Sequence, residues 1–252
     1  MGKLDGKVAI ISGAAQGVGR GVALAMHKHG AKVVILDINQ AGAEKTAADI
    51  IAAGGEALGL GCDISKQENI QQVVDKTVEV FGTVDIMVNN AHASTQKPLE
   101  MLTAEDFALS FNTGFWATHH FMQAVFPIFK EKKAGKIINF GSNSSILGHA
   151  YQGAYAAAKE AIGAITKVAA TEWGIHNINV NILCPFANSP GMIAWSEKFP
   201  QEYEKTINRI PLRRVGDCQN DIGEVAAWLA SSEADYVTGQ TILVDGGAHY
   251  IR

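Results

Sequence analysis

Residues 8–19 read VAIISGAAQGVG, and this stretch decides the fold. The apolar run at 8–12 predicts a buried strand, and the glycine-rich turn after it opens a helix over residues 17–29. Glycines at such a junction let backbone N–H groups approach a pyrophosphate, which the helix N-terminus then stabilises. The spacing Gly-x-x-x-Gly-x-Gly is not the commoner Gly-x-Gly-x-x-Gly, but its place between a strand and a helix makes it specific. The turn therefore predicts a dinucleotide site, whose expected residues are Gly13, Gln16, Gly17, Val18 and Gly19.

Asp37 ends the next apolar run, residues 32–37, and lies 18 positions after Gly19 (37 − 19). This is close to the separation of about 20 residues at which an acidic side chain binds the adenosine ribose. A carboxylate there accepts hydrogen bonds from the ribose hydroxyls and repels a 2′-phosphate. No Lys or Arg lies in the glycine turn. NAD is therefore the expected cofactor and NADP the less favoured one, although Asp37 as a plain turn former or cap is the alternative.

The rest of the chain alternates short apolar runs with helical stretches. Strands are expected at residues 8–12, 32–37, 57–62, 84–89, 136–140, 179–183 and 241–244. Helices are expected at residues 17–29, 40–53, 66–81, 103–130 with a bend near Pro127, 154–170 and 221–231. This alternation predicts an α/β fold: a single-domain, Rossmann-like, doubly wound seven-stranded parallel sheet with helices on both faces. One Pro- and Gly-punctuated insertion at about 185–214, the lid segment, is expected to cover the substrate.

Composition excludes several classes of protein. Of the 252 residues, 47% are hydrophobic, which is enough for a sizeable core. The formal charge of −4 and the lack of a Lys/Arg cluster argue against nucleic-acid binding. No signal peptide and no run of about 20 apolar residues is apparent, so a cytoplasmic protein without a membrane span is expected. The three cysteines are far apart and are interpreted as reduced structural thiols. No metal site is expected.

Ser142, Tyr155 and Lys159 form a second pattern. In the helix predicted at 154–170, positions i and i+4 share a face, so Tyr155 and Lys159 project together. An ammonium beside a phenol favours the phenolate and lowers a pKa that is ordinarily about 10, so this tyrosine could exchange a proton with an alcohol or carbonyl oxygen. Ser142 follows the strand at 136–140, and open α/β sheets place their chemistry at such carboxyl ends. Taken alone, the pattern also fits a solvated surface pair beside an ordinary loop.

Over essentially its whole length the chain resembles the short-chain dehydrogenase/reductase family. The glycine turn and the Ser142, Tyr155 and Lys159 pattern carry this resemblance together with several further motifs. These are Asp63-Ile64, Asn89-Asn90-Ala91, Asn112, Asn179-Val180-Asn181 before Pro185, and Val244-Asp245-Gly246-Gly247. Because the motifs are independent and occur in order, chance agreement at all of them is very improbable.

The resemblance implies a role for each matched residue. Asp63 and the backbone of Ile64 would bind the adenine, Asn90 would pack by the cofactor ribose, and the loop at Pro185 would contact the nicotinamide carboxamide. Ser142 would orient the substrate oxygen and Tyr155 would be the general acid or base. Lys159 would bind the nicotinamide ribose and lower the tyrosine pKa, and Asn112 would hold a water that connects Lys159 to solvent. The resemblance also implies a homotetramer, or a homodimer, formed through the long helix, the Tyr155 helix and the last strand.

Two positions depart from the family pattern. His92 stands where the family has glycine after Asn-Asn-Ala, and Pro185-Phe186 replaces Pro-Gly, with Ser189 in place of the usual threonine. Together with Cys184-Pro185, Arg214-x-Gly216-Asp217 and residues 169–174, these features resemble bacterial hydroxysteroid dehydrogenases, including those acting on bile acids. A bulky apolar small-molecule substrate is therefore expected, with contacts from His92, Ser144, Gln152, Met192 and Trp195. The alternatives are a packed or solvated His92 and an apolar group that only forms the core of the lid segment.

Other functions compete with a hydroxysteroid dehydrogenase. A 3-oxoacyl thioester reductase of the same family usually favours NADPH, which Asp37 argues against, and a small-alcohol or polyol dehydrogenase would share every motif. A sugar-nucleotide epimerase or dehydratase would require a longer chain. Outside enzymes, a nucleotide-sensing Rossmann module would be expected to have lost part of the catalytic set, which is complete here.

Overall fold

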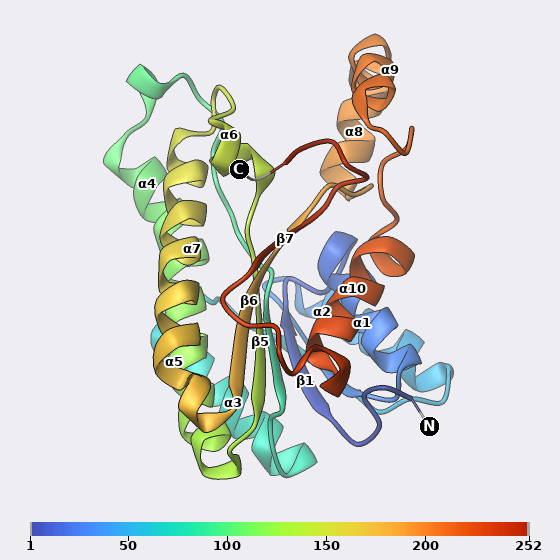
Figure 1. Cartoon of the computed structure of the whole chain (residues 1–252), viewed down its shortest axis with the longest axis vertical. Coiled ribbons are helices and arrows are strands. Elements are labelled where there is room, and N and C mark those ends of the chain that lie inside the picture. Colours follow the sequence, from blue (N-terminus) through green and yellow to red (C-terminus); the bar gives the residue numbers. More distant parts are fainter. Residues whose placement is uncertain (1, 251–252) are drawn as a thin grey trace.

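A seven-stranded sheet forms the centre of the computed structural model, which describes residues 2–250 (Figure 1). All pairings are parallel, and the strand order is β3-β2-β1-β4-β5-β6-β7. The strands are β1 (Val8–Ser12), β2 (Lys32–Asp37), β3 (Ala57–Gly61), β4 (Ile86–Asn89), β5 (Gly135–Phe140), β6 (Ile178–Pro185) and β7 (Thr241–Val244). The predicted doubly wound parallel sheet is confirmed.

Helices cover both faces of the sheet. The α-helices are α1 (Gly17–Lys28), α2 (Gln40–Ala52), α3 (Gln67–Phe81), α4 (Ala104–Ser110), α5 (Ala117–Lys132), α6 (Asn143–Leu147), α7 (Gly153–Trp173), α8 (Pro190–Lys198), α9 (Pro200–Arg209) and α10 (Glu224–Ala230). Short 3₁₀ turns are η1 (Leu99–Met101), η3 (Gly174–His176) and η5 (Ser232–Ala234). Helices α3, α5 and α7 pack on one face, and α1, α2 and α10 pack on the other (Figure 1).

The strands are apolar on both sides because both faces are covered. In β1, Ile11 belongs to the core under α1 and α2, whereas its neighbour Ile10 belongs to the core under α3 and α5. Strand order reverses between β1 and β4, which pair with each other although β2 and β3 lie between them in sequence. In doubly wound sheets, ligands bind at the carboxyl ends of the strands beside such a reversal.

The helix predicted at 103–130 is not one regular helix. A π-helical segment, η2 (Phe111–Trp116), separates α4 from α5, whereas Pro127 lies within α5, so the irregularity falls well before the predicted bend. A π turn takes up an extra residue and rotates every following side chain about the helix axis. A second π segment, η4 (Cys218–Gly223), likewise precedes α10, so that the helix predicted at 221–231 begins irregularly.

The lid segment is more regular than its Pro and Gly content suggests. It contains two helices, α8 and α9, and both begin with proline at the first helical position, where the missing N–H costs no helical hydrogen bond. Figure 1 shows them rising above the carboxyl end of the sheet, on the opposite side from α4 and α6. Within residues 2–250, no helix has the length and apolar character needed to cross a membrane.

Candidate active site

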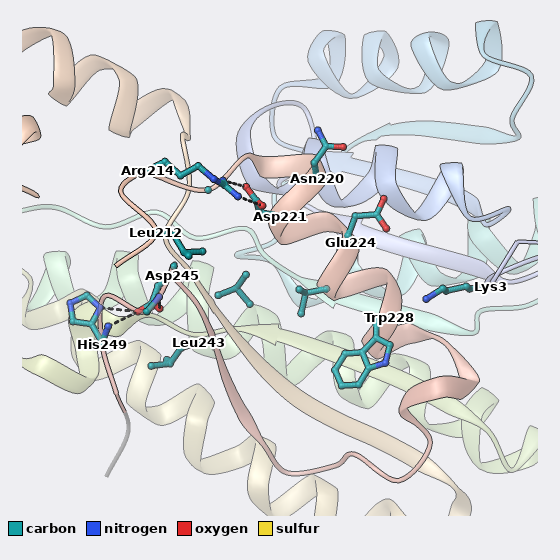
Figure 2. A pocket seen from close by; sticks show the side chains of 15 residues that line it. Lys3, Leu212, Arg214, Asn220, Asp221, Glu224, Trp228, Leu243, Asp245 and His249 are labelled. Atoms are coloured by element: carbon teal, nitrogen blue, oxygen red, sulfur yellow. Dashed lines mark hydrogen bonds and ion pairs between the residues drawn. The ribbon is translucent and has the colours of Figure 1, made fainter. Parts of the chain in front are cut away.

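One cavity collects most of the residues predicted to be functional. It has a volume of about 520 Å³ and runs along the carboxyl ends of the central strands. Its lining includes Gly13, Gln16, Gly17, Val18, Asp37, Asp63, Ile64, Asn90, His92, Tyr155, Lys159 and Pro185. A larger cavity of about 690 Å³ lies between β7 and α10, beside the Arg214–Asp221 and His249–Asp245 pairs (Figure 2). Tyr155 and Lys159 line the smaller cavity and are not among the residues of the larger one, so we take the smaller cavity as the candidate site. Ser142 lines a separate cavity of about 310 Å³, to which Lys159 also contributes.

The glycine turn forms a bare cradle at one end of this cavity. Gly13 has φ +66°, and a Cβ added to it would lie 2.9 Å from the Cα of Ala91. A Cβ on Gly19 would lie 2.2 Å from the carbonyl oxygen of Gly13, closer than any real contact. The Asn90 amide donates to the Gly13 carbonyl at 3.1 Å, so the residue that follows the neighbouring strand β4 holds the turn in place. Only glycine fits these positions, and a turn of this shape before a helix N-terminus suits a pyrophosphate.

Two carboxylates line the end of the cavity that lies beside β2 and β3, away from Tyr155. Asp37 accepts hydrogen bonds from the backbone N–H of Ala15 at 3.1 Å and of Asn39 at 3.0 Å, so its side chain is fixed across the turn. Asp63 accepts from the Ser65 hydroxyl at 2.7 Å, and this bond lowers the pKa of the Asp63 carboxyl. Among the described residues that line the cavity, the one lysine or arginine is Lys159, at its other end.

Tyr155 and Lys159 share one face of α7, as their spacing predicts. The Lys159 Nζ lies 5.6 Å from the centre of the tyrosine ring and donates to the Phe140 carbonyl oxygen at 2.6 Å. Lys159 is buried, and burial lowers the pKa of its ammonium from 10.5 to about 8. The effect of Lys159 on the tyrosine pKa stays a prediction, because the net direction of the shift is set by other causes. Burial raises the pKa of the Tyr155 phenol, and the Ser142 hydroxyl opposes this effect without cancelling it.

Ser142 lies at the junction of β5 and α6. It caps α6 by accepting the backbone N–H of Ser144 at 3.1 Å, and its hydroxyl also acts on the Tyr155 phenol. The neighbouring Asn143 donates to the Asp245 carboxylate at 2.9 Å. Buried Asp245 also accepts the backbone N–H groups of Gly247 and His249, so it joins the end of β7 to the Ser142 turn. The sequence identified this Asp245 motif but not its supporting role.

The structure does not bring the side chain of Asn112 to Lys159. Asn112 lies in the π segment η2 and is exposed, and the cavity lining includes its neighbour Thr113 instead. The physical reason is the π turn, which shifts the phase of the helix at this point. A Cβ on Gly114 would point at His92, 3.0 Å from its imidazole. Glycine at 114 gave no sequence signal of this contact, because the partner comes from another element.

Among the candidate substrate residues, His92 alone lines the cavity within the described chain. Its ring stacks on that of Tyr155 with centroids 4.8 Å apart. Gln152 has a buried Oε1 with no hydrogen-bond partner among residues 2–250, whereas Ser144 donates its backbone N–H to Ser142. Met192 and Trp195 belong to α8, where Trp195 packs against Tyr203 of α9, so at least part of this apolar group is core of the lid segment.

Comparison with known proteins identifies the family. A family model described as enoyl-(acyl carrier protein) reductase matches residues 13–249. The chain belongs to the short-chain dehydrogenase/reductase family. The 12α-hydroxysteroid dehydrogenase of a Clostridium species is 37% identical over 255 residues, and the match covers 98% of each protein. The 3-oxoacyl-(acyl-carrier-protein) reductase of Thermotoga maritima is 33% identical over 97% of this chain and 98% of its own. A solved structure from Sinorhizobium meliloti 1021, provisionally described as a short-chain alcohol dehydrogenase, superposes with a TM-score of 0.92 at 31% identity, covering 97% of each chain.

As a short-chain dehydrogenase/reductase, the protein is an oxidoreductase acting on alcohols or ketones. The family normally uses a nicotinamide cofactor, either NAD or NADP. The resemblance inferred from the motifs is therefore confirmed, and hydroxysteroid dehydrogenases are among the relatives. The residues of the cavity fit such a cofactor: the glycine cradle excludes side chains where a pyrophosphate would lie, and Tyr155 and Lys159 line the far end.

Proposed function

We propose that the protein interconverts a secondary alcohol and a ketone with NAD, with Tyr155 as general acid and base and a bulky apolar molecule such as a hydroxysteroid as substrate. The observation that carries the proposal is a single cavity with a glycine cradle and Asp37 at one end and Tyr155 and Lys159 at the other. This layout supports hydride transfer and proton transfer at neighbouring atoms of one substrate.

The charges along the cavity support NAD over NADP. The carboxylates of Asp37 and Asp63 lie at the adenosine end, where a 2′-phosphate would add two further negative charges. Two backbone N–H groups donate to the Asp37 carboxylate, so moving this side chain out of the cavity would break two hydrogen bonds. The one lysine in the described lining is Lys159, which lies at the catalytic end and donates to the Phe140 carbonyl. The ribose hydroxyls of NAD are the partners that this end can bind.

The proposed chemistry assigns each group one task. The nicotinamide, when bound, supplies or accepts the hydride. Ser142 would orient the substrate oxygen by donating a hydrogen bond to it while keeping its own proton. In ketone reduction Tyr155 gives that oxygen its one proton. Because burial raises the tyrosine pKa, the phenol is protonated at neutral pH and ready to donate. In alcohol oxidation the same phenol must first lose its proton, so this direction gains from alkaline conditions. Lys159 holds a positive charge beside the ring.

The surface around the carboxyl end of the sheet supports a bulky apolar substrate. Large apolar side chains are exposed on three separate segments there: Leu99 and Met101 in η1, Ile146 and Leu147 in α6, and Ile193 in α8. Figure 1 places η1 and α6 near α4 on one side of this end and α8 on the other. Exposed apolar side chains on separate elements around one end of the sheet offer surface that a bulky apolar substrate could cover. The 37% identical 12α-hydroxysteroid dehydrogenase supports the same substrate class.

A nicotinamide absorbance assay of the purified protein tests this function. NAD and NADP are compared at equal concentration against hydroxysteroids, aliphatic secondary alcohols, polyols and 3-hydroxyacyl thioesters. Turnover of a hydroxysteroid with NAD is the expected result. Turnover with NADP alone contradicts the cofactor assignment, and turnover of thioesters or polyols alone contradicts the substrate class. NAD binding without any turnover favours a nucleotide-sensing module.

A further inference from the structure

The protonation pattern of His92 follows from its neighbours. The Ser110 hydroxyl donates to the Ala154 carbonyl at 3.1 Å, and a hydroxyl has one proton. The 2.8 Å contact between Ser110 Oγ and His92 Nε2 therefore has the imidazole N–H as its donor. In a neutral ring the remaining nitrogen, Nδ1, is then an acceptor with a free lone pair. Burial, together with the ammonium of Lys159, lowers the pKa of His92 to about 3, so the ring is neutral under ordinary conditions.

This free acceptor has no partner among the described residues. The Nδ1 atom of His92 is fully buried and makes no hydrogen bond there, although leaving a buried acceptor unpaired is unfavourable. The ring lines the candidate cavity and stacks on Tyr155 with an interplanar angle of 24°. It is close enough to Lys159 for that ammonium to lower the pKa of the imidazole. A buried acceptor without a protein partner is a place where an ordered water is commonly bound.

Room for this ring comes from Gly114 on the π segment. A Cβ at position 114 would lie 3.0 Å from Nε2 and 3.2 Å from Nδ1 of His92. The imidazole therefore fills the space that a side chain at 114 would otherwise enter. Asn112, the residue expected to hold a water for Lys159, is exposed two positions earlier. Gly114 and His92 are thus complementary, and the imidazole supplies a polar atom where position 114 has none.

We propose that His92 is a positioning residue for proton transfer: its ring supports the Tyr155 phenol, and its Nδ1 accepts a hydrogen bond from a water that links to Lys159, the role expected of Asn112. The proposal rests on the proposed function, because it concerns the proton path of the same site. Ser110 anchors the ring by accepting its Nε2–H. Removing Nδ1 while keeping an aromatic ring should therefore slow proton transfer without weakening nucleotide binding.

Three full-length variants separate the ring from its acceptor. His92→Phe keeps an aromatic ring on Tyr155 and removes Nδ1, and we expect kcat to fall about 10- to 100-fold, with KM and the NAD Kd within about threefold. The double variant His92→Gly with Gly114→Asn places an amide oxygen in the vacated space and should recover at least a third of that loss on a logarithmic scale, which a merely structural role would not predict. His176→Phe makes the same chemical change at the opposite end of the sheet and is the matched control.

Unchanged kcat in His92→Phe, or a loss in Asn112→Ala without one in His92→Phe, overturns the proposal. Histidine ¹⁵N NMR gives a readout that does not depend on turnover. We expect a His92 signal with unprotonated Nδ1 that shifts when Lys159→Met removes the ammonium, and a protonated Nδ1 or an unmoved signal also overturns the proposal. An inactive wild-type protein with the expected NMR signal contradicts the proposed function alone, so the two failures are distinguishable.

Discussion

The nucleotide end and the catalytic end of the cavity are built in different ways. At the nucleotide end, glycines and backbone N–H groups make the site, and Asp37 and Asn90 have their hydrogen bonds satisfied within the protein. At the catalytic end, side chains from separate elements meet, and the buried His92 Nδ1 has no hydrogen-bond partner among residues 2–250. The contrast indicates that the first end recognises a fixed shape, whereas the second keeps hydrogen-bonding capacity for the reaction.

Tyr155→Phe is expected to have the largest effect, and it tests whether catalysis can be lost while nucleotide binding is kept. Loss of the phenolic hydroxyl should reduce kcat by about 10²–10⁴-fold, because a general acid and base is removed. The NAD Kd should stay within about threefold, since the glycine cradle and Asp37 are untouched. Absorbance turnover and fluorescence titration with NAD measure the two effects. Activity retained in this variant would refute the role given to Tyr155.

Gly13→Ala should have the opposite signature. The added Cβ meets the Cα of Ala91 and the Asn90 amide at 2.9 Å, and alanine is strained at φ +66°. We expect the NAD Kd to rise at least tenfold and the free energy of unfolding to fall by about 1–3 kcal/mol. Gly174→Ala is the matched control, because its φ is −55° and its Cβ would meet nothing within 4 Å. Equal effects of the two substitutions would show that the cradle is not shape-selective.

Asp37→Asn tests whether the negative charge at the nucleotide end selects NAD over NADP. The amide oxygen can still accept the Ala15 N–H, but the negative charge is gone. The ratio of kcat/KM for NAD to that for NADP should fall about tenfold, which corresponds to about 1.4 kcal/mol. Asp49→Asn, which removes a carboxylate paired with Arg20 on the surface, serves as control. An unchanged ratio would mean that Asp37 does not select the cofactor.

Lys159→Met examines what burial costs at the catalytic end. The pKa of Lys159 is 10.5 in the unfolded chain and about 8 in the native protein, a penalty on the order of 3 kcal/mol for the charged form below pH 8. Replacing Lys159 also removes its hydrogen bond to the Phe140 carbonyl, which reduces the gain in stability by about 1 kcal/mol. We expect the cofactor-free variant to be about 1–2 kcal/mol more stable than wild type at pH 7, and inactive.

The pH dependence of this stability difference has a definite sign. Between about pH 8 and 10.5 the unfolded chain binds the Lys159 proton and the native protein does not, so the contribution of this group to stability rises with pH. The advantage of Lys159→Met should therefore shrink across this window. Cys62, whose pKa burial raises to about 11, acts oppositely above pH 9, but its contribution is common to both proteins. Denaturant unfolding at several pH values measures the difference, and a constant difference would contradict burial of the charge.

Local spacing in the sequence was enough to predict the sheet, the glycine turn, the place of Asp37 at the end of β2 and the shared face of Tyr155 and Lys159. Each depends on the period of a strand or helix or on a turn of a few residues, and these are properties of consecutive sequence. The lid segment was placed by its Pro and Gly residues, but its two helices were not predicted, because proline at a first helical position resembles a loop signal.

Tertiary structure alone decided how the catalytic end is arranged. The π turn at Phe111–Trp116 directs Gly114 to His92 and leaves Asn112 exposed, and one residue of helical phase is not readable from an apolar pattern. The stacking of His92 on Tyr155 joins β4 to α7 across the cavity. The directions of the Tyr155 and Lys159 pKa shifts also depend on tertiary structure, because burial is produced by every neighbour in space. The sequence reveals only that the lysine lies one helical turn from the tyrosine.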